Sequence, residues 1–262
     1  MTTAAVLLLI LIGFCAGLFG ALAGVGGGVI LTPLLAIYFE LPMHQAIGVT
    51  LLCVIATSTA TSALYVERHV TDVRLGMTLE LATTAGALIA ALVAHRVNHR
   101  TLAILLAGFL LYSSGSMVRK AWTSRKEKRE ESIPDYTPQN YPVGLVASVI
   151  AGGFSGLLGI GGGPIKMPVM YLVMKVPLRV AAATSNFMIG VTAATSVYIY
   201  WGRGDVRMDM AAPLVAGVFT GGLLGARISP KVRPFYILLL LVGLTGWLAA
   251  QMIYKLLLGG FQ

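Results

Sequence analysis

Long apolar stretches separated by short polar ones dominate the hydropathy pattern of this chain. Eight of them are about 18 to 25 residues long, the length of α-helix that crosses about 30 Å of hydrocarbon. We expect helices near 4–22, 44–65, 75–94, 101–118, 143–158, 180–200, 208–226 and 235–256, with shorter apolar arms at 29–39 and 164–174. The pattern predicts an all-α polytopic membrane protein with about eight transmembrane helices and two short broken or re-entrant arms.

A glycine cassette precedes each short arm, and the two cassettes lie 135 residues apart. The first is Gly24–Gly28, followed by Pro33, and the second is Gly159–Gly163, followed by Pro168. Helix-breaking residues inside apolar segments leave backbone N–H and C=O groups unpaired unless these groups line an enclosed or watery site. The cassettes therefore indicate a membrane transporter with discontinuous helices.

The cassettes belong to a tandem duplication. Residues 16–63, placed over 151–198 without a gap, give 13 identities in 48 positions, and the glycines and prolines of the cassettes coincide. We call two residues that are 135 positions apart mates; beyond the aligned stretch the match slips by two residues, so that 72–74 fall on 205–207, and Gly86 again meets Gly221. We expect a first transmembrane repeat at 1–118, a basic cytoplasmic linker at 119–142 and a second transmembrane repeat at 143–262.

Composition and charge narrow the class further. The chain is 57% hydrophobic and 11% charged, whereas about a quarter of the residues of a soluble domain are charged. The net charge is +9, and the basic residues lie in loops between apolar segments. Positive loops of this kind set the orientation of a membrane protein, and we prefer this role to binding of nucleic acid. Cys15 and Cys53 lie within apolar spans, so no disulfide framework is indicated. The first span begins almost at Met1 without a basic segment before it, and we expect a retained helix.

The distribution of Lys and Arg tests the membrane topology. Six basic residues in the linker place it in the cytoplasm. If the cassette arms only extend helices, the two halves have the same orientation in the membrane. In that topology 11 Lys and Arg residues lie on the cytoplasmic side and 7 on the outer side, with Lys166 left out of the count. If each cassette folds back, the second half is inverted, and the division becomes 13 to 5. The stronger bias favours two inverted structural repeats.

Both cassettes have the chemistry to bind an anion. The N-terminal end of a half-helix exposes N–H groups and carries about half a positive charge, and glycine lets a ligand approach the backbone closely. We expect a mid-membrane substrate site lined by Gly26, Gly27, Gly28, Gly161, Gly162 and Gly163. The alternative role of glycine is close helix packing, and we prefer it for the scattered Gly13, Gly17 and Gly108.

Lys166 stands three residues after the second glycine triplet, inside an apolar arm, and its mate is Leu31. An ammonium group deep in the bilayer costs about 3 kcal/mol or more, so such residues mark functional sites. We expect Lys166 to supply a fixed positive charge for an anionic substrate. The alternative is a lysine whose side chain extends to the membrane interface.

Polar side chains in the following segments provide candidate donors for anion oxygens. Thr50 and Ser185 are mates, and Asn186 follows Ser185. Their hydroxyl and amide groups could donate to substrate oxygens. Thr57 and Thr192 recur on the same segments, and for them helix–helix or i−4 bonding is the better interpretation.

Glu80, about two turns into the third segment, is a candidate for carrying a coupling proton; a membrane-edge carboxylate facing Arg74 is an equal alternative. The histidines fall at loop ends without a cluster of ligands, so we expect neither a metal site nor a cofactor. An intramembrane enzyme would need a nucleophile–base pair or a metal cluster. The sequence offers neither, and we expect no catalytic activity.

The duplicated GxGGGxxxxP cassette in a membrane protein of this length resembles the TauE/SafE (TSUP) family of sulfite and organosulfonate exporters. The likeness extends over the chain, through Gly24–Pro33, the Pro-Met-His-Gln-Ala-Ile-Gly-Val-Thr stretch of 42–50, the basic central loop, Gly159–Pro168 and 181–186. It implies secondary carriers of sulfite, sulfoacetate or other sulfonates. The Leu31 and Lys166 pair departs from strict symmetry of the site.

Together these features predict a multi-pass secondary transporter of the inner (plasma) membrane, a probable exporter of sulfur-containing anions by alternating access. The expected partners are a small anionic substrate and the lipid bilayer, without nucleic acid, and a homodimer is left open. A passive anion channel is the alternative function, and the sequence does not separate it from a carrier.

Overall fold

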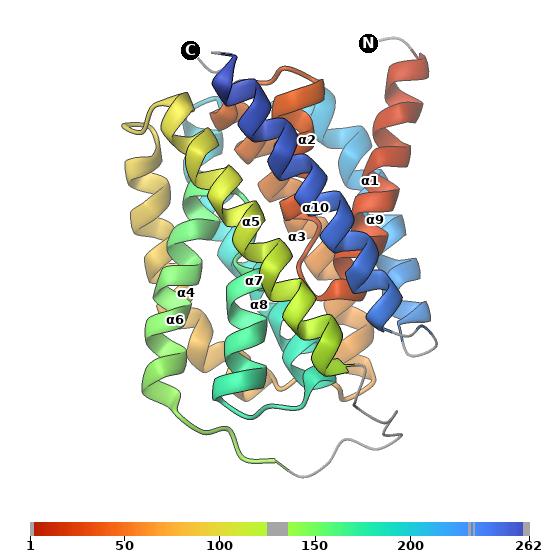
Figure 1. The fold of residues 1–262 in the computed structure, drawn as a ribbon, viewed down its shortest axis with the longest axis vertical. Helices are drawn as coiled ribbons and strands as arrows, with labels where there is room; N and C mark the ends of the chain where they lie inside the picture. Colours follow the sequence, from red (N-terminus) through yellow and green to blue (C-terminus); the bar gives the residue numbers. More distant parts are fainter. Residues whose placement is uncertain (1–2, 125–135, 230–231, 233, 259–262) are drawn as a thin grey trace.

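The protein is a bundle of helices, described here from a computed structural model (Figure 1) that covers residues 3–124, 136–229, 232 and 234–258. The first half contains α1 (Thr3–Ala23), α2 (Gly28–Tyr38), α3 (Met43–Glu67), α4 (Val73–Ala94) and α5 (His99–Ser124). The second half contains α6 (Tyr141–Leu158), α7 (Gly163–Pro168), the π-helix η1 (Val169–Val173), α8 (Leu178–Gly202), α9 (Met208–Ile228) and α10 (Pro234–Leu257). Eight helices among the described residues are long and apolar enough to cross a membrane. The expected all-α polytopic fold is confirmed.

Prolines and one carboxylate set several helix starts. Pro42 and Pro177, which are mates, directly precede α3 and α8, and proline favours this position because it lacks the N–H that a helix start leaves unpaired. Asp72 caps α4 by accepting a hydrogen bond from the Leu75 N–H through its side chain. The helix boundaries therefore repeat between the halves because the same breaking residues repeat.

The helices of the two halves interlock. α1 packs against α9, and its counterpart α6 packs against α4; α3 and α8 pack against each other, as do α5 and α10. In Figure 1, α5 and α10 lie side by side and run in opposite directions, and α1 begins near the top of the view whereas α6 begins near the bottom. This exchange of partners fits the predicted inverted repeats. The opposite orientation of the halves in a membrane stays a prediction.

Hydrogen bonds between the halves follow the same exchange. The Arg68 guanidinium, after α3, donates to the Ala226 carbonyl of α9 at 3.2 Å. Its mate Arg203, after α8, donates to the Ala91 carbonyl of α4 at 2.8 Å, and Ala91 and Ala226 are themselves mates. The duplicated sequence thus forms duplicated contacts, each of which joins one half to the other.

The central position belongs to α3 and α8. In their most apolar windows, 67% and 61% of the residues are buried inside the protein, against 33% for α1 and α10. A helix surrounded by protein does not need a lipid-compatible face, so α3 and α8 can carry polar side chains. These two helices bring the polar candidates of the sequence into the interior.

Two expectations about helix ends and packing need correction. α5 continues to Ser124, six residues into the expected linker, and residues 125–135 of that linker lie outside the described residues.

Gly13 and Gly17 do allow close packing, because a Cβ on Gly13 would lie 2.5 Å from the Leu214 carbonyl oxygen and one on Gly17 would collide with Val218. Gly108 does not, since a Cβ there would have no neighbour within 4 Å.

Candidate functional site

Each cassette is a tight reversal between two helices. Gly24, Gly26 and Gly27 all have positive φ angles, of 74°, 80° and 69°. The mates in the second cassette, Gly159, Gly161 and Gly162, repeat them at 70°, 77° and 71°. This left-handed region is open to glycine and costly for other residues. The spacing of the glycines is therefore the spacing that the backbone reversal requires.

The arm after each cassette folds back along the preceding helix. A Cβ on Gly27 would lie 3.0 Å from the Ala16 carbonyl oxygen, and a Cβ on its mate Gly162 would lie 2.8 Å from the Ala151 carbonyl oxygen. A straight continuation would separate residues 16 and 27 by about 16 Å at 1.5 Å per residue. Each cassette thus folds back on the preceding helix inside the bundle, and its path relative to the membrane stays a prediction.

The tips of the two hairpins touch each other at the centre of the protein. A Cβ on Gly28 would lie 2.8 Å from the Gly159 carbonyl oxygen, and one on Gly163 would lie 3.1 Å from the Gly24 carbonyl oxygen. A Cβ on either Gly26 or Gly161 would meet the side chain of Ile189 from α8. The six glycines expected to line a site are therefore brought together, in an arrangement in which the tips are packed and closed.

Lys166 lies in the last turn of the six-residue helix α7 and is almost completely enclosed, with 2% of its surface exposed. Its Nζ is 3.3 Å from Oε2 of Glu80 on α4 and 3.1 Å from Oγ1 of Thr192 on α8. The Thr192 hydroxyl is also within hydrogen-bonding distance of Glu80 Oε1, and Thr84 Oγ1 is 3.4 Å from the same oxygen. We call Glu80, Thr84, Lys166 and Thr192 the buried ion-pair cluster.

The cluster shows where the side chains of Lys166 and Glu80 lie, while their roles in anion binding and proton coupling stay predictions. Lys166 does not extend to an interface, because its ammonium ends on a carboxylate that is itself only 3% exposed. The Glu80 carboxylate faces Lys166, not Arg74. Two opposite charges taken out of water can stabilise each other only when their geometry is good and hydrogen bonds satisfy the remaining atoms. Here the two threonine hydroxyls contact the carboxylate.

Ser185 and Asn186 lie near the first cassette, on the other side of the tips. The Ser185 hydroxyl donates to the Gly24 carbonyl and the Asn186 amide donates to the Ala21 carbonyl, both at a long 3.4 Å. Asn186 Oδ1 and Thr50 Oγ1 are buried without a hydrogen-bond partner among the described residues. Buried polar atoms without partners are unusual. Ser185 and Asn186 therefore contact the first hairpin, whereas Lys166 contacts Glu80 and Thr192.

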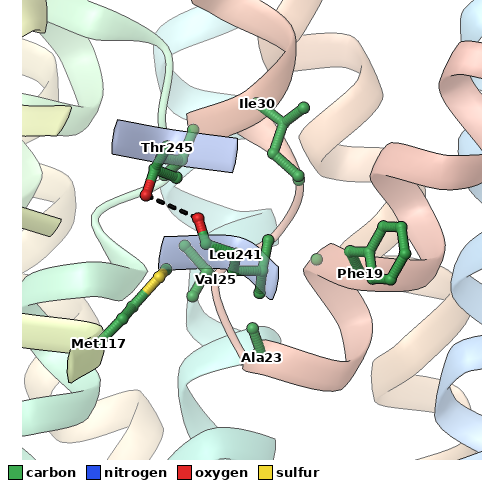
Figure 2. A pocket seen from close by; sticks show the side chains of 10 residues that line it. Phe19, Ala23, Val25, Ile30, Met117, Leu241 and Thr245 are labelled. Atoms are coloured by element: carbon green, nitrogen blue, oxygen red, sulfur yellow. Dashed lines mark hydrogen bonds between the residues drawn. The ribbon is translucent and has the colours of Figure 1, made fainter. Parts of the chain in front are cut away.

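A pocket lies outside the first cassette, between the α1–α2 hairpin and helices α5 and α10 (Figure 2). Apolar groups line it, among them Phe19, Val25, Ile30 and Met117. The Thr245 hydroxyl at its edge donates to the Leu241 carbonyl of its own helix at 2.7 Å. The residues that line the pocket carry no charged side chain and are mostly apolar, so it does not suit an anion.

The segment between the halves is tied to the helix that carries Glu80. The Tyr136 hydroxyl donates to Asp72 Oδ2 at 2.8 Å, and Asp72 caps α4. Burial, followed by the hydrogen bond to the Asp72 carboxylate, raises the pKa of Tyr136. The phenol therefore stays a neutral donor at physiological pH, and the contact holds the end of the linker against the start of α4.

Comparison with known proteins gives the family. Residues 9–252 match the family described as "Sulfite exporter TauE/SafE". The chain belongs to this family. It is similar to the probable membrane transporter protein YunE of Bacillus subtilis, at 28% identity over 95% of the chain and 97% of YunE. It is also similar to a probable membrane transporter protein of Methanocaldococcus jannaschii, at 26% identity over 91% and 92% of the two chains. No solved structure gave a significant match.

As a TauE/SafE family member, the chain is a multi-pass membrane transporter of the inner membrane, and its helices and its relatives agree on this. Sequence reasoning named Glu80 and Lys166 separately and missed that they are partners. The two lie 86 positions apart and in different repeats. One signal was available: neither has a charged mate, since Lys166 corresponds to Leu31 and Glu80 to Val215.

Proposed function

We propose that this TauE/SafE protein is a secondary transporter, a probable exporter, of sulfur-containing anions such as sulfite or organosulfonates. The observation that carries the proposal is Lys166, a cation enclosed at the second glycine reversal and next to the first. An intramembrane cation of this kind marks a substrate pathway far more often than it serves the fold. The family's printed description, which names sulfite export, supports the same class of substrate.

The surroundings of Lys166 suit a small oxyanion. Sulfite and sulfonates present several oxygens around one sulfur, and an ammonium, a hydroxyl and backbone N–H groups can each donate to one of them. Lys166 and Thr192 supply the first two, and Gly162 and Gly163 at the start of α7 supply the third. Thr50, Ser185 and Asn186 are proposed to contact the anion when the hairpin tips separate during the transport cycle.

The packing at the centre favours a carrier over a channel. Val54 of α3 and Ile189 of α8, which are mates, both stand against the glycine tips. A channel needs a continuous path, whereas a carrier closes its site and opens it to one side at a time. The closed tips support alternating access, with the rearrangement of the two hairpins as the proposed movement.

Counterflow of radiolabelled sulfite in proteoliposomes tests the proposal. We expect Lys166→Met to lower the uptake at least tenfold, Lys166→Arg to retain part of it because the charge remains, and Leu31→Met at the mate position to leave it within twofold. With the membrane potential clamped at zero by potassium and valinomycin, a passive channel would give no counterflow, and it would give a sulfite conductance across planar bilayers. Normal counterflow in Lys166→Met would remove Lys166 from the site.

A further inference from the structure

Glu80 occupies the position at Lys166 that a substrate anion would need. In the closed structure the Lys166 charge is already neutralised by Glu80 at 3.3 Å. An anion that binds Lys166 must therefore take the place of the carboxylate. We propose that substrate anion and Glu80 compete for Lys166, and that each anion bound places one proton on Glu80, so that anion and proton cross the membrane together. This inference rests on the proposed function and adds its coupling ion; export of a monovalent anion then requires an outward anion gradient larger than the inward proton gradient.

The burial of Glu80 makes the proton uptake necessary. When the ammonium turns to the substrate, the carboxylate stays in an apolar interior, 3% exposed, without a cation. An isolated buried carboxylate is far less stable than the neutral acid, so such groups take up a proton. The proton comes from the water on the side from which the anion enters. Protonated Glu80 gains an O–H donor, and the Thr192 hydroxyl lies in range to accept it.

Lys166 is the charged residue that the described structure places against Glu80. α4 packs on α6 and α8. α6 contains no acidic or basic side chain, and the basic residue of α8, Arg179, precedes Thr192 by 13 positions, or about 20 Å along a helix. On α4 itself, Arg74 lies six positions earlier. The protonation of Glu80 should therefore depend chiefly on Lys166.

Within the described residues, this combination of a buried lysine, carboxylate and threonine occurs once. At the mate positions Leu31 and Val215 are apolar, and Thr57, the mate of Thr192, donates only to the Cys53 carbonyl of its own helix. If one anion replaces one carboxylate at Lys166, one proton is taken up for each anion bound. For a monovalent sulfonate, the empty and the loaded cluster then carry the same net charge, and transport should respond to a pH gradient but not to the membrane potential.

The test measures proton uptake on anion binding by the purified wild-type protein in weakly buffered detergent solution. Isethionate is the first probe, because its sulfonate stays ionised at every working pH and cannot itself take up the proton. We expect about one proton taken up per isethionate bound. By linkage, the Kd should rise about tenfold for each pH unit above the point where free Glu80 is ionised. Binding without proton uptake would overturn the proposal.

Glu80→Gln provides the matched variant. It should bind isethionate with a Kd that does not change with pH and without proton uptake, and its transport should lose the dependence on the pH gradient. If isethionate does not bind but sulfite does, the readout is the difference in proton uptake between wild type and Glu80→Gln, because sulfite itself titrates in this range. A difference of zero contradicts the coupling.

The two proposals fail in different ways. If wild-type protein binds neither isethionate nor sulfite, the proposed function is wrong, and the coupling falls with it. If it binds either anion and no proton follows, only the coupling is wrong. Because Glu80→Gln leaves a lone buried ammonium and can lower the yield of folded protein, the isethionate titration of the wild type decides the question without any variant.

Discussion

The two glycine hairpins share one backbone and differ in their side chains. Both reverse at three glycines with φ near 70° to 80°. On the second arm, however, Lys166 joins Glu80 and Thr192, whereas on the first arm Leu31 is packed in the apolar core. The comparison teaches that the duplication preserves the positions of the helices, and that the charge belongs to one copy only. In the proposed function, this asymmetry corresponds to a single transport site that has its cation on the second arm.

The outer sides of the hairpins differ as well. The pocket in Figure 2 lies against the first hairpin, where Ala23 and Val25 line it. Their mates in the second hairpin are the larger Leu158 and Ile160, both fully buried. The second arm also contains the π-helix η1, whereas α2 is a continuous α-helix. π-helical turns are rare in proteins as a whole, and those that occur are often found at functional sites. The presence of η1 agrees with the placement of Lys166 on this arm.

The sharpest test of the comparison concerns orientation, since inverted halves put mates on opposite sides of the membrane. Glu67 at the end of α3 and its mate Gly202 at the end of α8 are both exposed. In a background without Cys15 and Cys53, we expect Glu67→Cys and Gly202→Cys to react with an impermeant maleimide from opposite sides of intact cells. Labelling of both from the same side would contradict the inversion and leave a parallel duplication.

Substitutions on the outer side of the second hairpin, which is filled by Leu158 and Ile160, should lower the free energy of unfolding more than substitutions on the outer side of the first hairpin, which faces the pocket. Leu158→Ala removes a fully buried side chain and should cost about 2–5 kcal/mol. Ala23→Val adds methyl groups toward a pocket and should change stability by less than about 1 kcal/mol. Thermal unfolding in detergent measures both. Equal losses in the two variants would show that the pocket is not available to added atoms.

Mate glycines should differ in their tolerance of a side chain. Gly26→Ala and Gly161→Ala both pay for a positive φ, which costs about 1–2 kcal/mol at each site. At Gly161 the added Cβ also collides with Ile189, whereas at Gly26 it lies 3.1 Å from that side chain. We expect the larger drop in melting temperature for Gly161→Ala, with Gly108→Ala as the control that has open space. The reverse order would mean that Ile189 adapts at no cost.

Mate threonines offer the finest comparison. Thr192 and Thr57 each bond a carbonyl four residues earlier, but only Thr192 also contacts Lys166 and Glu80. Thr192→Val should lower sulfite counterflow about tenfold, equivalent to one lost hydrogen bond to a charged group of about 1.4 kcal/mol. Thr57→Val should stay within twofold. Similar losses in both would assign the threonines a purely structural role.

Much of the fold could be predicted from the sequence, because its signals are local. Span length, the cassette glycines and the prolines before α3 and α8 determine where helices begin and end, and the observed ends lie within a few residues of those expected, apart from α5. The candidate site itself stays a prediction; the structure adds that the glycine-rich tips of the two hairpins pack against each other. The pairing of Glu80 with Lys166 was not predictable in this way, because no local pattern connects α4 with α7.

The sequence by itself therefore determined the membrane class, the duplication and the backbone reversals, since hydrophobic length and glycine stereochemistry act over a few residues. Only the tertiary structure decided that Lys166 is paired, that Ser185 and Asn186 donate to carbonyls of the first hairpin, and that the tips close on each other. These facts depend on which helices become neighbours. Inside a low-dielectric interior, the neighbour that a charge receives determines what it can bind.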